Sequence, residues 1–192
     1  MTELCFATNN RKKLEEVSQM LEGKYKLLTL QDIGCHEELA EDQDTLEGNS
    51  RQKAEYVWQN YNINCFADDT GLEVAALNGA PGVYSARYAG PQHSDTDNVQ
   101  HLLQNLEGKE DRSARFRTYI TLYLNGQEHQ FEGIVNGRIT TEWQGDKGFG
   151  YDPVFVPEDY NHTFAQMSSA EKNAISHRGR AIQKLVAFLK AQ

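Results

Sequence analysis

Two adjacent carboxylates, Asp68 and Asp69, follow the apolar residues 65–67 and precede Thr70 and Gly71. The apolar run predicts the end of a buried strand, and open α/β sheets bind ligands beyond the carboxyl ends of their strands. Because side chains alternate along a strand, Asp68 and Asp69 can face one site only if the chain turns there, and Gly71 permits a turn. Neighbouring carboxylates need a cation, a proton or a basic partner, and Mg²⁺ with substrate phosphates would satisfy them. A capped turn and a metal site are both consistent with this stretch.

A second polar segment, Thr8-Asn9-Asn10-Arg11-Lys12-Lys13, joins a predicted strand at residues 3–8 to a predicted helix. A strand followed by a polar turn and a helix start presents free backbone N–H groups to an anion. Lys13 can add a point charge over a phosphate. The Gly-x-x-x-x-Gly-Lys pattern of a Walker loop is absent. An ordinary capped helix start is the alternative interpretation.

The remaining pattern predicts a mixed α/β fold. Strands are expected at residues 25–30, 65–68 and 72–77, with a helix at 49–61, and this alternation favours parallel pairing. Asn125-Gly126 between strands at 114–124 and 127–139 is a strong hairpin signal. Capping residues predict three further helix starts, at Ser94, Ser168 and Ser176.

Composition narrows the class of protein. The net charge of −9 disfavours a nucleic-acid partner. No apolar run approaches the roughly 20 residues of a membrane-spanning helix, and no signal peptide is expected, so we predict a cytoplasmic protein without membrane contact. Cys5, Cys35 and Cys65 are odd in number and lack Cys-x-x-Cys spacing, which predicts buried thiols in a reducing compartment.

Three other segments could contribute to a site. The acidic run at residues 37–44 is a solvated loop or the source of a second metal ligand. Residues 79–91 hold Ser85 and Arg87, which are candidates for substrate or subunit contact or parts of a rigid packed loop. In residues 145–153, glycines let the backbone approach a flat ligand and Phe149 offers a stacking face.

Five segments, in one order across the chain, resemble the non-canonical purine nucleoside triphosphate pyrophosphatases, the Ham1/RdgB-like inosine triphosphatase family. The segments are Phe6-Ala7-Thr8-Asn9-Asn10 with Lys13, Ala67-Asp68-Asp69-Thr70-Gly71-Leu72, residues 79–88, Gly148-Phe149-Gly150-Tyr151-Asp152-Pro153 and Glu171-Lys172-Asn173-Ala174-Ile175-Ser176-His177-Arg178-Gly179.

The resemblance implies a single domain over residues 1–192, an α/β fold with a long mixed sheet flanked by helices, and two lobes around a substrate cleft. It implies hydrolysis of ITP, dITP or XTP to the monophosphate and pyrophosphate, which cleanses the nucleotide pool. Water would attack the α-phosphorus with the help of Mg²⁺, and the enzyme would be a homodimer. A pyrophosphatase for other modified nucleotides and a non-catalytic nucleotide sensor are the alternatives.

The resemblance also assigns roles to residues. Asp69 would be the general base or a metal-bound carboxylate, Asp68 could share that role, and Glu41 would be the companion metal ligand. The expected substrate-binding residues fall into three groups: Thr8, Asn9, Asn10, Arg11, Lys12 and Lys13 with Thr70 and Lys172 at the phosphates; Phe149, Gly150, Tyr151 and Asp152 at the purine; His177 and Arg178 as donors to its 6-oxo edge.

Two positions depart from the family pattern. Gly48 stands where the family usually has Glu, so an acidic contact is lost or moved to Glu47. Asn9 stands where Gly is commoner, which would tighten the approach of a phosphate.

Overall fold

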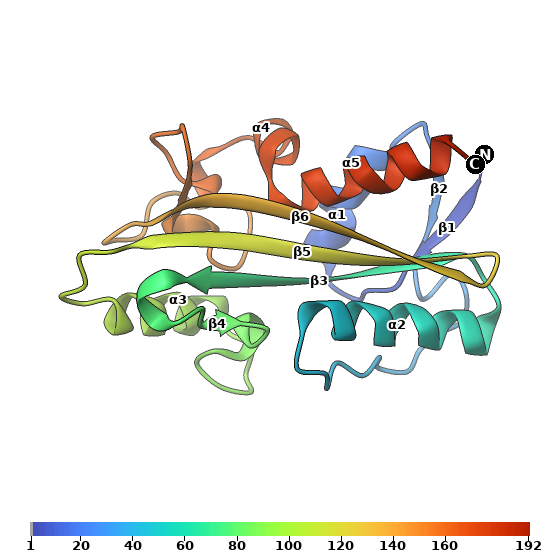
Figure 1. The fold of residues 1–192 in the computed structure, drawn as a ribbon, viewed down its shortest axis with the longest axis horizontal. Helices are drawn as coiled ribbons and strands as arrows, with labels where there is room; N and C mark the ends of the chain where they lie inside the picture. Colours follow the sequence, from blue (N-terminus) through green and yellow to red (C-terminus); the bar gives the residue numbers. More distant parts are fainter. Residues whose placement is uncertain (1) are drawn as a thin grey trace. The chain divides into compact units, whose positions relative to one another are not determined.

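The computed structural model describes residues 2–192, and the chain forms two compact units. Unit 1 comprises the described residues up to Asp69 together with Thr118–Gly133 and Arg178–Gln192. Unit 2 comprises Thr70–Arg117 and Ile134–His177. The mixed sheet has the strand order β2-β1-β3-β5-β6-β7, with β4 paired to β3 (Figure 1). The strands are β1 (Glu3–Phe6), β2 (Lys26–Leu28), β3 (Cys65–Val74), β4 (Pro81–Gly82), β5 (Ser113–Leu124), β6 (Gln127–Ile139) and β7 (Phe155–Pro157).

Five α-helices occur in the described chain: α1 (Arg11–Leu21), α2 (Leu46–Tyr61), α3 (Asp95–Asn105), α4 (Ser169–Ile175) and α5 (His177–Lys190). Short 3₁₀ turns lie at Ala75–Leu77, Ser85–Arg87, Asp152–Val154 and Phe164–Gln166. Among residues 2–192, no helix has both the length and the apolar character needed to cross a bilayer.

In unit 1, β1 lies between β2 and β3 and pairs with both in parallel. The register places Cys5 opposite Cys65 and Phe6 opposite Phe66, so the carboxyl end of β1 lies beside the start of β3, which continues past it. Because side chains alternate, each strand contributes to two cores. Phe6 and Phe66 stack with ring centroids 4.7 Å apart in the core formed with α1 and α5, whereas their neighbours pack in a core with α2.

In unit 2, β4 pairs antiparallel with the second half of β3, and β7 pairs antiparallel with the end of β6. The core joins Leu72 of β3 and Leu102 of α3 to the aromatic group Phe116, Phe155 and Phe164. Burying each of these side chains contributes about 1.5–3 kcal/mol to folding.

Local sequence signals predicted several features correctly. Asn125 and Gly126 form the turn between β5 and β6 with φ of 52° and 83°, the positive values that this hairpin turn requires. Ser94 caps α3, and Ser168 forms a capping box with Glu171 at α4. The three cysteines are free and buried.

The predicted turn after Asp69 is wrong. β3 continues without interruption from Cys65 to Val74, and Gly71 does not adopt a positive φ. The strand continues because Leu72 and Val74 extend its alternation into the buried core of unit 2. Consequently Asp68 and Asp69 are consecutive residues of one strand.

Element boundaries also differ from the prediction at α2 and β3. α2 begins at Leu46 rather than at residue 49, because the Thr45 side chain accepts a hydrogen bond from the Gly48 N–H and caps the helix. The strand predicted to reach residue 77 ends at Val74, where a 3₁₀ turn begins.

Candidate active site

Asp68 is a buried, fully compensated carboxylate in unit 1. Its Oδ1 accepts a hydrogen bond from Lys13 Nζ at 2.9 Å, and its Oδ2 accepts one from Arg178 Nε at 2.8 Å. Burial alone would raise its pKa, but Lys13, Arg178 and Lys53 outweigh that effect and hold the pKa well below its usual range. Asp68 therefore stays ionised and organises cations beyond the carboxyl end of β1.

Asp69 has a different environment. Its Oδ2 accepts a hydrogen bond from Asn49 Nδ2 at 3.0 Å, which connects it to α2. Burial raises the pKa of Asp69, and Glu41 adds to that shift, while Lys53 and Lys13 oppose it. The negative charge of Asp69 is thus incompletely compensated by the protein, which is the condition under which a carboxylate binds a cation or a proton.

Lys53 connects the acidic loop to β3 and was missed by the sequence analysis. Its ammonium group donates to Glu41 Oε1 at 2.5 Å and to the Asp68 carbonyl oxygen at 2.6 Å, and only 4% of the residue is exposed. Although burial acts in the opposite direction, the carboxylates of Glu41, Asp69 and Asp68 raise the pKa of Lys53. One signal was present in the sequence: Lys53 lies four residues before the apolar Val57, and residues four apart share one face of a helix.

Asn49 was missed as well, and it contacts two parts of the site. Its Oδ1 accepts from the Gln43 N–H at 2.9 Å while its Nδ2 donates to Asp69. The neighbouring position 48 favours glycine, because a Cβ there would lie 2.9 Å from the Gln43 Cβ. The glycine allows the acidic loop to pass close to the first turn of α2.

The segment between β1 and α1 combines a helix cap with a cluster of cations. Asn10 Oδ1 accepts from the N–H groups of Lys12 and Lys13, and Thr8 Oγ1 accepts from the Asn10 N–H. The capped-helix interpretation is therefore correct. The first turn holds three basic residues and no acidic one, although positive charge at a helix N-terminus is unfavourable. An anion bound at this turn would compensate those charges.

The predicted phosphate residues differ in their exposure. Thr8 is buried, Lys13 is half-buried, and Asn9, Arg11 and Lys12 are exposed. Thr70 follows Asp69 in β3 and is half-buried.

In unit 2, the glycine-rich loop is shaped by Asp152. Its Oδ2 accepts from the Phe149 N–H at 3.1 Å and from Lys172 Nζ at 2.7 Å. Gly148 has φ of +71°, and a Cβ on it would lie within 2.1 Å of the same oxygen, so only glycine fits there. The Lys172 ammonium also lies 4.8 Å from the centroid of the Phe149 ring. These contacts hold the Phe149 ring in a fixed orientation.

Two hydrogen bonds attach this loop to other elements of unit 2. Tyr151 donates its hydroxyl to the Ser85 carbonyl at 2.6 Å, and the Gly150 N–H donates to Asp95 Oδ2 at 2.9 Å. Burial raises the pKa of Tyr151, so the hydroxyl remains a donor. The Ser85 hydroxyl is bonded to the Gly82 carbonyl and the Leu72 N–H, which supports the rigid-loop interpretation for Ser85.

His177 and Arg178 are both buried. The His177 ring, in unit 2, stacks on Phe116 with centroids 4.5 Å apart. In unit 1, Arg178 donates from Nη1 to Glu16 Oε1 at 2.7 Å in addition to its bond to Asp68. Their expected contact with a 6-oxo group stays a prediction, and so does a contact of Lys172 with phosphate.

The donor set suits a small hard cation that is bound together with the substrate, and it does not form a complete metal site by itself. Within residues 2–192, no group of three or more His, Cys, Asp or Glu side chains is arranged to hold a metal ion. Glu41 and Asp69 offer two carboxylates in unit 1, and Mg²⁺ is commonly held by one or two carboxylates plus substrate phosphates.

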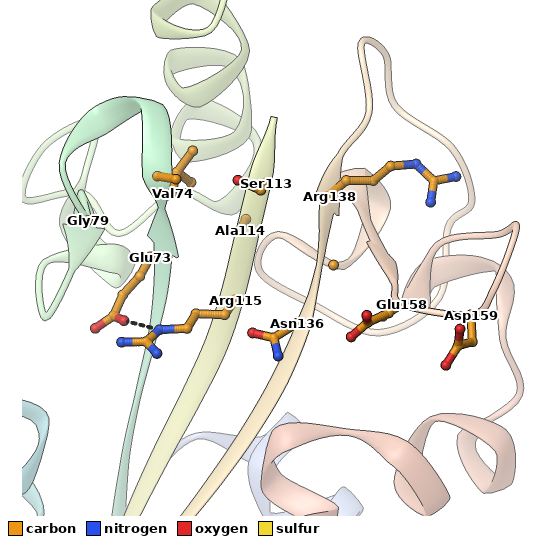
Figure 2. A pocket seen from close by; sticks show the side chains of 12 residues that line it. Glu73, Val74, Gly79, Ser113, Ala114, Arg115, Asn136, Arg138, Glu158 and Asp159 are labelled. Carbon is orange, nitrogen blue, oxygen red and sulfur yellow. Dashed lines mark hydrogen bonds and ion pairs between the residues drawn. The ribbon is translucent and has the colours of Figure 1, made fainter. Parts of the chain in front are cut away.

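An open hollow of about 710 Å³ lies elsewhere in unit 2 (Figure 2). Figure 2 shows its charged lining, with Glu73 of β3 paired to Arg115 of β5 and with Asn136 and Arg138 on β6. None of the predicted site residues lines it. The hollow is therefore separate from the chemistry described above.

Fold and charge pattern define an α/β protein with two residue clusters, one suited to phosphate and a cation and the other to a flat aromatic ligand. The chain belongs to the Ham1 family, whose model matches residues 4–188. A protein of Flavobacterium psychrophilum named dITP/XTP pyrophosphatase is 53% identical over 188 residues, which cover 98% of this chain and 99% of that protein. A protein of Bacillus subtilis with the same name is 44% identical over 195 residues, 100% of this chain and 98% of the relative.

Solved structures agree with this assignment. The Ham1 protein of Staphylococcus aureus matches with a TM-score of 0.89 at 38% identity, covering 99% of each chain. A Ham1 protein of Coxiella burnetii matches with a TM-score of 0.91 at 36% identity over all of both chains. The predicted family and the mixed α/β fold are confirmed.

Proposed function

We propose that this protein is a nucleoside triphosphate pyrophosphatase that hydrolyses dITP, ITP and XTP to the monophosphate and pyrophosphate. The proposal is carried by the environment of Asp69, a half-buried carboxylate whose pKa is raised although Lys53 and Lys13 lie nearby. Relatives named dITP/XTP pyrophosphatase, aligned over nearly the whole chain, support the same activity.

Residues of unit 1 would bind the phosphates and the cofactor. The N-terminal turn of α1 offers backbone N–H groups and basic side chains to the triphosphate, and Lys13 is held in position by Asp68. Glu41 and Asp69 would hold the divalent ion, which we propose to be Mg²⁺; when bound it stabilises negative charge on the phosphates. The Glu41 carboxylate forms an ion pair with Lys53. A bound cation could replace Lys53 as the partner of that carboxylate.

A direct metal ligand is a poor base, so if Glu41 alone contacts the cation, Asp69 would receive a proton during the reaction. Attack of water on the α-phosphorus forms a phosphorus–oxygen bond, breaks the bond to the bridging oxygen and releases pyrophosphate. The water loses a proton. Because the pKa of Asp69 is raised and that of Asp68 is lowered in the metal-free protein, Asp69 is the better proton acceptor. Asp68, with two cations at hydrogen-bond distance, would position Lys13 and Arg178.

Residues of unit 2 would bind the base. With the Lys172 ammonium over Phe149, we propose that the purine stacks on the opposite face of that ring. Donors aimed at a 6-oxo group would discriminate against adenine, whose 6-amino group is itself a donor. The family resemblance gives His177, in unit 2, and Arg178, which belongs to unit 1, as the proposed donors.

The proposal is tested by measuring pyrophosphate and phosphate release from dITP, ITP, XTP, GTP and ATP, with and without Mg²⁺. We expect Mg²⁺-dependent pyrophosphate release from dITP, ITP and XTP, with loss of at least about 10²-fold in Asp69→Asn. Asp44→Asn, at an exposed aspartate of the acidic loop, is the matched control and should retain activity. Equal turnover of ATP would refute the base selectivity, and tight binding of ITP without turnover would indicate a sensor instead.

We further propose a cytoplasmic homodimer with residues 1–192 as one functional domain. The family resemblance supports the dimer and the domain, and three free buried thiols support a reducing compartment. Light scattering coupled to size-exclusion chromatography measures the mass directly, and a mass of one chain would refute the dimer.

A further inference from the structure

The acidic loop that carries Glu41 lies along α2 and makes a series of side-chain contacts with it. Residues 36–45 contain no helix or strand. Along the loop, Glu37 contacts Tyr61 and Tyr56, Glu41 contacts Lys53, Asp42 contacts Gln52 and Gln43 contacts Asn49. As the loop number rises the helix number falls, so the loop runs antiparallel to the helix. One helix thereby aligns Glu41 and, through Asn49, Asp69.

At the start of this loop, Glu37 is held by hydrogen bonds from two tyrosines. Its Oε2 accepts from the Tyr56 hydroxyl at 2.6 Å, and its Oε1 accepts from the Tyr61 hydroxyl at 2.7 Å. The rings of both tyrosines and the buried Cys35 belong to the same apolar cluster, so both donors are held in place by packing. Hydrogen bonds to an ionised acceptor are stronger than neutral ones.

The other end of the loop is fixed independently. Asp42 and Gln52 exchange two hydrogen bonds, of 3.2 Å and 2.8 Å, and the Gln43 N–H donates to Asn49. Glu41 therefore lies between two anchors. When its carboxylate leaves Lys53, the anchors keep its backbone at the same place on α2.

We infer that Glu37, held by Tyr56 and Tyr61, is a positioning residue that keeps the Glu41 carboxylate in place for a divalent cation. The inference rests on the proposed function, because it takes Glu41 as a cation ligand. Glu37 itself touches neither substrate nor cation. Its effect is to reduce the conformational freedom that the loop must lose when the cation binds.

The test uses the full-length double variant Tyr56→Phe/Tyr61→Phe, which keeps both rings in the apolar cluster and removes both donors. Hydrogen exchange of residues 37–44 is measured without metal and nucleotide, and the affinity for Mn²⁺ is measured by titration without nucleotide. We expect exchange to become faster by about tenfold and Mn²⁺ affinity to fall by about tenfold, the scale of one lost charged hydrogen bond in a partly exposed site. At saturating Mg²⁺ the kcat should remain within about twofold of wild type.

Two further variants complete the experiment. Tyr123→Phe removes the exposed hydrogen bond from that hydroxyl to Glu128 in the same unit, and it should change neither exchange of the loop nor Mn²⁺ affinity. Glu37→Gln removes the charge of the acceptor without touching the apolar cluster, and it should reproduce the double variant in weaker form.

Two results would overturn the inference. One is a double variant with unchanged Mn²⁺ affinity, whether or not its loop exchanges faster. The other is an equal loss of affinity in Tyr123→Phe, which would indicate a general loss of stability. If the wild-type protein hydrolyses ITP with Mg²⁺ and binds Mn²⁺, either result refutes the positioning role of Glu37 alone. A wild-type protein that does neither refutes the proposed function and the inference together.

Discussion

Adjacent aspartates on opposite faces of β3 should respond oppositely to the same substitution. Asp68→Asn removes the partner of Lys13 and Arg178, whereas Asp69→Asn removes a charge that burial disfavours. We therefore expect Asp68→Asn to destabilise the metal-free protein and Asp69→Asn to stabilise it. Both substitutions keep nearly the same volume, so packing does not explain a difference between them.

The magnitudes follow from burial and pairing. The side chain of Asp68 is 1% exposed and makes two ion pairs, and breaking a buried pair from one side costs about 3–5 kcal/mol. For a chain of this size, that corresponds to a fall in melting temperature of about 10 °C. For Asp69→Asn we expect a gain of about 1 kcal/mol, a rise of roughly 2–4 °C, because the Asn49 hydrogen bond can be retained.

The pH dependence separates the two effects. The pKa of Asp68 is lowered by folding, so its contribution is present above its unfolded pKa of about 3.9 and is lost as the pH falls through the folded value. The deficit of Asp68→Asn should therefore be constant from pH 5 to 8 and shrink only below about pH 4. The pKa of Asp69 is raised, so its penalty is present above the folded pKa and disappears as the pH falls toward about 3.9.

The assay is thermal unfolding followed by circular dichroism, with a chelator present, at intervals from pH 4 to 8. Asp44→Asn serves as the control, because Asp44 is exposed. The reasoning fails if Asp69→Asn lowers the melting temperature at pH 7 as much as Asp68→Asn does. It also fails if the gain of Asp69→Asn persists unchanged at pH 4.

Three further substitutions test the site. Lys53→Met should destabilise the protein by about 2 kcal/mol in urea titration at an unchanged m value, because it removes the Lys53 donor to the Asp68 carbonyl; an unchanged midpoint would contradict this. Gly148→Ala should raise KM for ITP at least about tenfold, because a Cβ cannot fit beside the Asp152 carboxylate at a positive φ. A KM within twofold of wild type would instead show that the loop adjusts to the added methyl group. Tyr151→Phe should cost about 1 kcal/mol, measured by the same urea titration, because the Ser85 carbonyl loses its hydroxyl donor; an unchanged stability would show that a water replaces that donor.

Features set by local backbone chemistry were predictable from the sequence. The Asn125-Gly126 hairpin, the caps of α3 and α4 and the first strand depend on residues close together in the chain. The start of α2 was placed three residues late, because Thr45 had not been recognised as its cap. The family and the mixed α/β fold were also predictable, since five motifs occur in a fixed order over most of the chain.

By itself, the sequence determined the family and the location of the two aspartates at the end of an apolar run; its assignment of phosphate and base segments stays a prediction. Only the tertiary structure decided how the charges are shared among Asp68, Asp69 and Lys53. β3 continues past Gly71 because its next residues are buried in a core that no local signal describes. That continuity directs Asp68 to Lys13 and Arg178 and Asp69 to Asn49, and the resulting difference in pKa comes from partners as many as 110 positions away in the chain.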